Sequence, residues 1–470
     1  MRLRPEPIEV TIDDPFKHDL LNRKPIADSL TELIRSSPDG LVLALHAPWG
    51  QGKTTFLNMW RQSLVNNGAR TIYFNAWETD FSEDALVALI GELTDGLSAT
   101  KGSIDNSALS DSVDSVKRIG AKMIRRVIPS MVKLGTAGII EASDFTENTL
   151  SDLASKIAEE KIEEYEESKK SIVEFRAAIE KVAKNASTKK NEQEPYPLII
   201  IVDELDRCRP NYAIRILECI KHLFSVKGVV FVLAVDRKQL SHAVRSQYGS
   251  GMDAVGYLRR FFDIEVSLPE PVGSQFIKSQ FSRFGLIQAF NNRENGSHNQ
   301  GDKNNFIQIL PKLFQCMMCS LRDQERAFTL ISLALRATPI NMYLHPELLS
   351  TLIVIRLKDP DLYADFSMGI AKPDVILDRL SAGPSGESFV KSKKGAHLEA
   401  LLNVCLISDY ERGLLLEKYQ VAADDPAADS EKRSRAQDIL NMISSGAIDS
   451  AFESLRYLLG KIDLFTEIER

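Results

Sequence analysis

The sequence has few cysteines, no excess of basic residues and no long apolar run. Five cysteines in 470 residues are too few for a disulfide scaffold and predict a reducing, cytoplasmic setting. Lysine and arginine total 58 against 65 acidic residues, a formal net charge of −7. No basic field therefore attracts the whole molecule to nucleic acid, and only a local patch leaves that partner open.

A membrane span or a secretory signal is not expected either. No stretch reaches the roughly 18 consecutive apolar residues that a spanning helix needs. The nearest candidate, residues 127–140, contains Lys133 and is interrupted by Pro129, Gly135 and Gly138. The first residues are polar and acidic, unlike a secretory leader.

What is present is the pattern of a globular α/β protein. Apolar residues make up 44 % and charged residues 26 % of the chain, and its length predicts two or three domains. Sheet-forming patterns predict strands at residues 41–46, 71–75, 198–202, 229–235 and 264–268, and the continuous apolar run at 41–46 is typical of a strand buried on both faces of a parallel sheet. Helical patterns lie between them. This alternation predicts a doubly wound, mainly parallel sheet, with a helical insertion and a helical carboxyl-terminal domain.

The domain boundaries follow from changes in composition. We expect the two halves of the sheet domain at residues 1–98 and 196–272, a helical insertion at 99–195, a helical lid at 273–380 and a carboxyl-terminal helical region at 381–470. In the insertion, four apolar residues follow heptad spacing: Ile172, Phe175, Ile179 and Val182. The insertion is either an arm for a partner or for self-assembly, or a solvated helical hairpin without a binding role.

A phosphate-binding loop of the Walker A kind follows the first strand. Residues 47–55 read Ala-Pro-Trp-Gly-Gln-Gly-Lys-Thr-Thr. Gly50 and Gly52 let backbone N–H groups approach phosphates, and the following helix adds the positive end of its dipole. Lys53 can reach the β- and γ-phosphates, and Thr54 can bind Mg²⁺. The strict pattern has glycine where Ala47 stands. The residues expected to bind nucleotide here are Trp49, Gly50, Gln51, Gly52, Lys53, Thr54 and Thr55.

Two carboxylates end the third predicted strand, as in a Walker B motif. A carboxylate at the end of a buried strand needs compensation, and Mg²⁺ next to Asp203 would supply it. Glu204 can then polarise a water for attack on the γ-phosphate. The alternatives are that Asp203 caps the next helix and that Glu204 forms an ion pair. Thr54 and Asp203 are thus the expected metal ligands.

Other charged residues near these motifs have two interpretations each. Asp206 and Arg207 either pair with each other or reach a neighbouring subunit. Asp236, at the end of the fourth strand, either senses the γ-phosphate or caps the following helix. Arg260, beside Arg259, and Arg322 are candidates for compensating the charge of the transition state, in cis or across an oligomer interface.

With these residues in hand, the chain resembles the KAP family of P-loop NTPases, a branch of the class with an added strand and a catalytic glutamate. The likeness covers roughly residues 14–323. Its most specific segments are 74–78 (Phe-Asn-Ala-Trp-Glu) and 203–208 (Asp-Glu-Leu-Asp-Arg-Cys). Further matching segments are residues 19–23, 49–55, 234–236, 257–262 and 321–323.

The resemblance implies an ATP-hydrolysing switch, often membrane-spanning in this family and often part of bacterial defence against phages or plasmids. It would place the segment ending at Arg23 near the adenine and Trp77 and Glu78 beside the γ-phosphate. Arg322 would belong to a helical lid. The insertion here lacks spanning helices, which argues against a membrane role.

The sequence therefore predicts a P-loop ATPase with ATP and Mg²⁺ as cofactors. Hydrolysis would drive a conformational or assembly switch, with a second copy of the chain or an effector protein as partner. The alternative is an ATP-gated oligomeric scaffold with little turnover, and a small-molecule kinase is disfavoured because no acceptor pocket is evident. The pair Cys316 and Cys319 has metal-ligand spacing, but without a second pair it indicates two core thiols.

Overall fold

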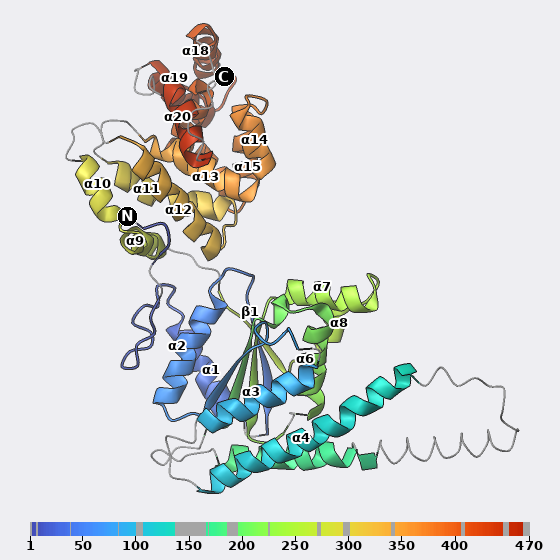
Figure 1. Cartoon of the computed structure of the whole chain (residues 1–470). Coiled ribbons are helices and arrows are strands. Elements are labelled where there is room, and N and C mark those ends of the chain that lie inside the picture. Colours follow the sequence, from blue (N-terminus) through green and yellow to red (C-terminus); the bar gives the residue numbers. More distant parts are fainter. Residues whose placement is uncertain are drawn as a thin grey trace, which may run out of the picture. The chain divides into compact units, whose positions relative to one another are not determined.

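The chain folds into two compact units in a computed structural model (Figure 1). The sheet unit comprises Glu9–Glu270, and the helical unit combines Met1–Ile8 with Pro271–Arg470. The finer division into five segments stays a prediction. The residues that the structure describes are 2–5, 8–37, 39–82, 84–99, 107–136, 166–167, 169–185, 196–223, 226–269, 274–294, 301–339, 344–405, 409–444 and 451–463.

Five parallel strands form one sheet in the order β2-β3-β4-β1-β5. All five strands were predicted, and the α/β fold is confirmed. The inner strands β1, β3 and β4 are buried along almost their whole length, as a sheet covered on both faces requires, whereas the edge strand β5 is partly exposed. The strands are β1 (Leu41–His46), β2 (Thr71–Asn75), β3 (Leu198–Asp203), β4 (Val229–Val235) and β5 (Ile264–Ser267).

Helices cover both faces of this sheet (Figure 1). On one face α3 and α6 pack on a core that includes Phe74 of β2 and Phe231 of β4. Successive residues of a strand point to opposite faces of the sheet. The residues next to Phe74 and Phe231 along their strands therefore face α1 and α2. The helices of this unit are α1 (Lys24–Arg35), α2 (Lys53–Asn66), α3 (Ala85–Ala99), α4 (Ser107–Thr136), α6 (Pro210–Leu223), α7 (Arg237–Tyr248) and α8 (Ala254–Leu258), with the 3₁₀ turn η2 (Leu205–Arg207).

The carboxyl ends of the strands meet along one edge of the sheet, because all five strands are parallel. The segment 47–52 leaves β1 at this edge, the segment 76–82 leaves β2, and η2 follows β3. Strand β4 lies between β1 and β3. Ligands of open α/β sheets bind outside the carboxyl ends of the strands, so this edge is where a site is expected.

The described part of the insertion packs on the sheet unit. Helix α4 lies against α3, and in a helix over residues 169–185 the side chains of Phe175, Ile179 and Val182 are fully buried in the core shared with the sheet. Asn185 Nδ2 donates to Ser112 Oγ at 2.8 Å and ties the two helices together. The heptad-spaced residues are therefore core residues. The predicted insertion also includes residues 100–106, 137–165 and 186–195, which lie outside the described ranges.

The helical unit has a separate core built around α13, which is buried from Pro346 to Ile355. The start of the chain joins this unit, since Arg2 N donates to Phe284 O and Thr329 Oγ1 donates to Leu3 O. No strand occurs in its described residues, as predicted. Its helices are α9 (Ser274–Arg283), α10 (Leu286–Glu294), α11 (Asp302–Cys316), α12 (Leu321–Ala337), α13 (Pro346–Lys358), α14 (Pro360–Ser367), α15 (Pro373–Ser381), α16 (Gly386–Lys391), α17 (Lys393–Val404), α18 (Asp409–Asp424), α19 (Ser430–Ser444) and α20 (Ala451–Asp463).

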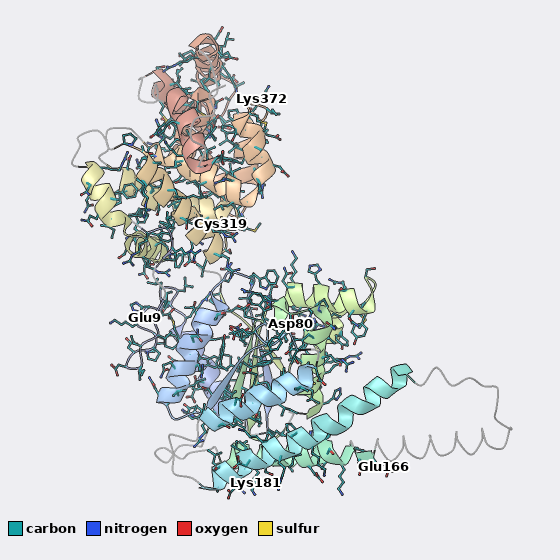
Figure 2. The ribbon with its side chains drawn as sticks, in the orientation of Figure 1. Glu9, Asp80, Glu166, Lys181, Cys319 and Lys372 are labelled. Atoms are coloured by element: carbon teal, nitrogen blue, oxygen red, sulfur yellow. The ribbon has the colours of Figure 1, made fainter. Side chains whose placement is uncertain are left out.

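None of the helices in the described ranges combines the length and the apolar character that crossing a membrane demands. Cys316 and Cys319 are both buried in the core of the helical unit, and Figure 2 labels Cys319. Within the described residues, no group of three or more histidine, cysteine or acidic side chains is arranged to hold a metal. The two thiols pack as core residues.

Candidate nucleotide site

The loop after β1 has the shape of a phosphate cradle. Gly50 and Gly52 adopt φ angles of 77° and 76°, which favour glycine. The buried guanidinium of Arg23 fixes the loop from behind, donating to Gln51 O at 2.8 Å and Gly52 O at 3.4 Å. Burial lowers the pKa of Arg23, an effect that Asp19 opposes. Arg23 thus anchors the loop backbone in this structure, and its predicted proximity to adenine stays a prediction.

Helix α2 begins at Lys53 directly after the loop. Its N-cap is Gly52, which has no side chain to accept hydrogen bonds from the first backbone amides. These N–H groups are therefore available to an anion. The Lys53 ammonium is buried, donates to Ala47 O at 2.7 Å and lies 3.4 Å from Asp206 Oδ2. Thr54 and Thr55 follow in the first turn. The lysine ammonium and the helix terminus thus lie together at the carboxyl edge of the sheet, as the predicted phosphate site requires.

Asp203 and Glu204 end β3 next to this helix. Asp203 is fully buried and accepts hydrogen bonds from Tyr73 OH at 2.9 Å and from the Glu204 N–H at 2.8 Å. The Thr54 hydroxyl donates to Glu204 Oε1 at 3.3 Å. Burial, and next the Asp203 charge, raise the pKa of Glu204, while Arg207 opposes this shift. The structure thus brings the predicted base and the predicted threonine ligand into contact.

Asp206 is the residue that joins the loop to the strands. Its Oδ2 accepts from Trp49 Nε1 at 2.9 Å and from Asp236 N at 2.5 Å, in addition to the contact with Lys53. Its side chain is 1 % exposed. Asp206 therefore does not pair with Arg207, one of the two alternatives that its sequence position left open.

Arg207 pairs with Glu204, not with Asp206. Its Nε forms an ion pair with Glu204 Oε2, and its guanidinium lies over the Trp77 ring, 5.8 Å from the centroid. Glu78, next to Trp77, accepts from Asn75 Nδ2 at 2.7 Å. Trp77 and Glu78 thus lie in the segment after β2, beside the end of β3, and their predicted proximity to the γ-phosphate stays a prediction.

Asp236 caps α7 and also contacts the loop. Its Oδ1 accepts from Lys238 N at 3.0 Å and from Gln239 N at 3.4 Å, and its Oδ2 accepts from Trp49 N at 3.1 Å. The helix-capping alternative is therefore present in the structure. The second contact ties the end of β4 to the phosphate loop, where a group that senses phosphate would lie.

The two arginine candidates belong to other segments of the chain. Arg260 is exposed in the turn between α8 and β5. Because β5 runs parallel to β1, this turn enters the amino end of the sheet, whereas residues 47–52 leave the carboxyl end of β1. Arg322 is exposed in the first turn of α12, in the helical unit. Within the sheet unit, Arg260 is therefore not brought to Asp203 and Glu204. The catalytic roles of both arginines stay predictions.

Sequence reasoning missed three contacts of this site. Asp206 was not connected with Lys53, Tyr73 was not connected with Asp203, and the Trp49 indole was not recognised as a donor. The available signal was the position of Tyr73 on the strand next to β3, where register pairs Asn75 with Asp203. The contacts of Asp206 depend on the geometry of η2, which the sequence pattern did not indicate.

The residues present fit a magnesium nucleotide. A hydroxyl and a carboxylate (Thr54 and Asp203) are hard oxygen ligands of the kind that Mg²⁺ prefers, and Mg²⁺ commonly takes its remaining ligands from phosphates and water. Three buried polar atoms at the loop have no hydrogen-bond partner in the described structure: Asp206 Oδ1, Gln51 Oε1 and Arg23 Nε. Such atoms are rare in proteins and indicate that a polar ligand or water completes the site.

Comparison with protein families agrees with this geometry. Residues 23–329 match the KAP family P-loop domain, which is well over half of the chain. The chain belongs to the KAP family. Members of the KAP family carry a P-loop NTPase domain, so nucleotide binding and hydrolysis are the activities that membership supports. No curated protein gives a significant match to the chain.

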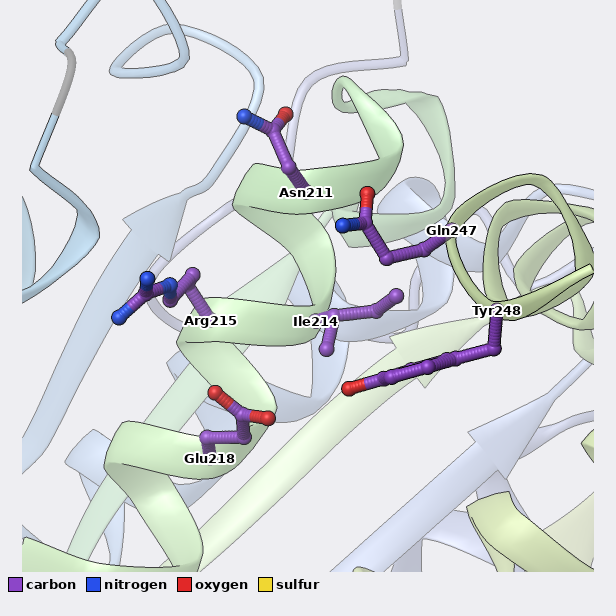
Figure 3. Close-up of a pocket in the computed structure, with 6 residues that line it drawn as sticks. All are labelled: Asn211, Ile214, Arg215, Glu218, Gln247 and Tyr248. Carbon is purple, nitrogen blue, oxygen red and sulfur yellow. The ribbon is translucent and has the colours of Figure 1, made fainter.

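A pocket of about 460 Å³ on the surface of this KAP domain is distinct from the loop (Figure 3). It lies between α6 and α7, and its lining includes none of the residues predicted for the nucleotide site. The Tyr248 hydroxyl at its rim lies 3.3 Å from the Tyr257 hydroxyl. The pocket is lined by Asn211, Ile214, Arg215, Glu218, Gln247 and Tyr248.

Proposed function

We propose that this KAP protein is a magnesium-dependent ATPase whose hydrolysis cycle drives a conformational or assembly change. The observation that carries the proposal is the contact between Glu204 and Thr54 beside the buried Lys53. A base, a metal-binding hydroxyl and a phosphate-binding cation thus share one edge of the sheet. The position of β4 between β1 and β3 supports membership of the class with an added strand and a catalytic glutamate.

In this mechanism the loop amides and Lys53 bind the β- and γ-phosphates of ATP. Thr54 and Asp203 would hold Mg²⁺, which would supply positive charge to neutralise the phosphates. Glu204 orients a water and accepts its proton while the water oxygen bonds to the γ-phosphorus and the bond to ADP breaks. Asp236 and Trp49 connect the phosphate end of the loop to β4. The products are ADP and inorganic phosphate.

The setting and the partners are further proposals. All five cysteines are free thiols, which supports a reducing, cytoplasmic compartment. The partner would be a second copy of the chain or an effector protein, and a role in anti-phage defence rests on family likeness alone. The rival function, an ATP-gated scaffold with little turnover, would use the same loop without Glu204 acting as a base.

Replacing Lys53 tests the binding half of the proposal. We expect Lys53→Ala to weaken binding of a fluorescent ATP analogue by about 10-fold or more, because a charged hydrogen bond to phosphate is lost. Lys238→Ala is the matched control, since Lys238 is an exposed lysine on α7 at the same edge of the sheet. An affinity unchanged in Lys53→Ala would contradict the site, provided that the control also binds normally.

A further inference from the structure

The turn after β3 places two neighbouring residues on different faces. In a 3₁₀ turn, side chains three residues apart lie one above the other. Arg207 N donates to Glu204 O at 3.1 Å, and the Arg207 side chain pairs with the Glu204 carboxylate. Asp206 instead faces the loop and meets Lys53. Leu205 is fully buried in the core and holds the turn in place.

Three carboxylates within four residues must each find their own partners. Asp203 has Tyr73 OH and a backbone amide, and Asp206 has Lys53, the Trp49 indole and a backbone amide. Glu204 has the Thr54 hydroxyl and the guanidinium of Arg207. Lys53 is taken by Asp206 and by Ala47 O, so Arg207 supplies the cation that contacts Glu204.

The backbone of Glu204 makes this second contact important. Glu204 has a φ angle of 62°, a left-handed conformation that a residue with a side chain seldom adopts. Its carboxylate depends on two groups for orientation: the Thr54 hydroxyl on one oxygen and Arg207 on the other.

The Arg207 guanidinium also contacts the segment that follows β2. Register pairs Asn75 with Asp203, and Ala76 N donates to Asp203 O at 3.0 Å, so the segment after β2 runs beside η2. There Trp77 N donates to Asn75 Oδ1 at 3.2 Å, and the Trp77 ring lies against the guanidinium. The ring is 55 % exposed, although large aromatic side chains are usually buried.

We propose that Arg207 is a positioning residue for Glu204 in ATP hydrolysis and that Trp77 holds Arg207 in that position. This inference rests on the proposed function. It predicts that the loss of Arg207 lowers turnover without weakening nucleotide binding. The binding contacts come from other residues: Lys53 is held by Ala47 and Asp206, and the loop is held by Arg23.

The first experiment compares two neighbouring arginines. Arg209 pairs with Asp80 at 3.0 Å in the same segment after β2, so Arg209→Gln is a matched control for Arg207→Gln. Figure 2 labels Asp80. We expect Arg207→Gln to lower kcat by about 10-fold or more, since it misplaces a general base. Its affinity for the ATP analogue should stay within about twofold of wild type. Arg209→Gln should keep the wild-type kcat.

Conservative variants give the second readout. Arg207→Lys keeps the charge but not the planar fork, so it should recover part of the lost kcat. Trp77→Ala should lower kcat by about two- to fivefold, the worth of one exposed cation–π contact, and Trp77→Phe should lower it less. Thermal unfolding of each variant shows whether it is folded. If Arg207 had a purely structural role, the kcat values would not follow this order, with Arg207→Lys above Arg207→Gln and Trp77→Phe above Trp77→Ala.

Two outcomes would overturn the inference while leaving the proposed function intact. One is a wild-type kcat in Arg207→Gln. The other is that Arg207→Gln loses kcat and affinity in parallel and that Arg209→Gln and Arg207→Lys show the same losses. In both cases the wild-type protein hydrolyses ATP and Glu204→Gln does not. If the wild-type protein itself shows no turnover, the proposed function and this inference are both contradicted.

Discussion

At the scale of single residues, the site is organised by a buried negative charge. Asp206 Oδ2 accepts from an indole, a backbone amide and the ammonium of Lys53. These donors come from the loop, from β4 and from α2. One carboxylate therefore ties the loop and the adjoining start of α2 to the residue that follows β4, and the cost of burying it is offset only while all three donors remain.

Removing this carboxylate should destabilise the sheet unit. We expect Asp206→Ala to lower the free energy of unfolding by about 3–5 kcal/mol, because it leaves the buried Lys53 charge unpaired. Urea unfolding measures this. Glu32→Ala is the control in the same unit, since it removes the pair with Arg35 from the surface of α1 and should change little. Equal effects of the two substitutions would contradict the role of Asp206.

Sequence reasoning reached the residue types of this site but not all of their pairings. Lys53, Thr54, Asp203 and Glu204 were predicted from a glycine-containing loop and from a strand that ends in carboxylates. The sequence left open whether Asp206 and Arg207 pair with each other or reach a neighbouring subunit. Arg207 pairs with Glu204 instead, and that pairing depends on the 3₁₀ turn that begins at Leu205. A sequence pattern does not specify such a turn, so the alternative remained open.

At the scale of elements, β1, β3 and β4 were predictable because each is a run of apolar residues, and β5 because apolar and polar residues alternate in it. The insertion was harder to interpret. Phe175 and Ile179 have the spacing of an interhelical seam, and they do pack between helices, but the partner surface includes α3 of the same chain. Periodicity shows that a face is buried and does not show against which element.

A buried histidine at the start of α13 makes the stability of the helical unit depend on pH. Its N-cap, His345, is 1 % exposed, and burial, with a smaller contribution from His397, lowers its pKa to about 4. An unfolded histidine has a pKa of about 6.5, so between these values the unfolded chain binds the additional proton. This contribution to stability is complete above about pH 6.5 and is lost as the pH falls toward 4.

Replacing His345 with asparagine tests this dependence. Asparagine does not titrate and tolerates the left-handed φ of 43° at this position. We expect the wild-type protein to lose on the order of 3 kcal/mol more stability than His345→Asn between pH 6.5 and 4. Denaturant unfolding of the helical unit at several pH values measures the difference. Parallel losses in the two proteins would show that another group is responsible.

At the scale of the whole molecule, the chain forms two units with separate cores. The phosphate loop, the carboxylates and the insertion belong to the sheet unit. The family match extends from residue 23 into the helical unit at residue 329. Under the proposed function, the sheet unit would bind and hydrolyse ATP, and the helical unit would be available to respond to that cycle.

Phosphate release from the purified protein tests the central claim most directly. We predict that the wild-type protein releases inorganic phosphate from ATP in the presence of Mg²⁺. Glu204→Gln should bind the nucleotide as tightly and lose turnover by about 100-fold or more, because it keeps the shape of the side chain but cannot accept a proton. Equal phosphate release by the two proteins would contradict the assignment of Glu204 as the base and with it the account of this site.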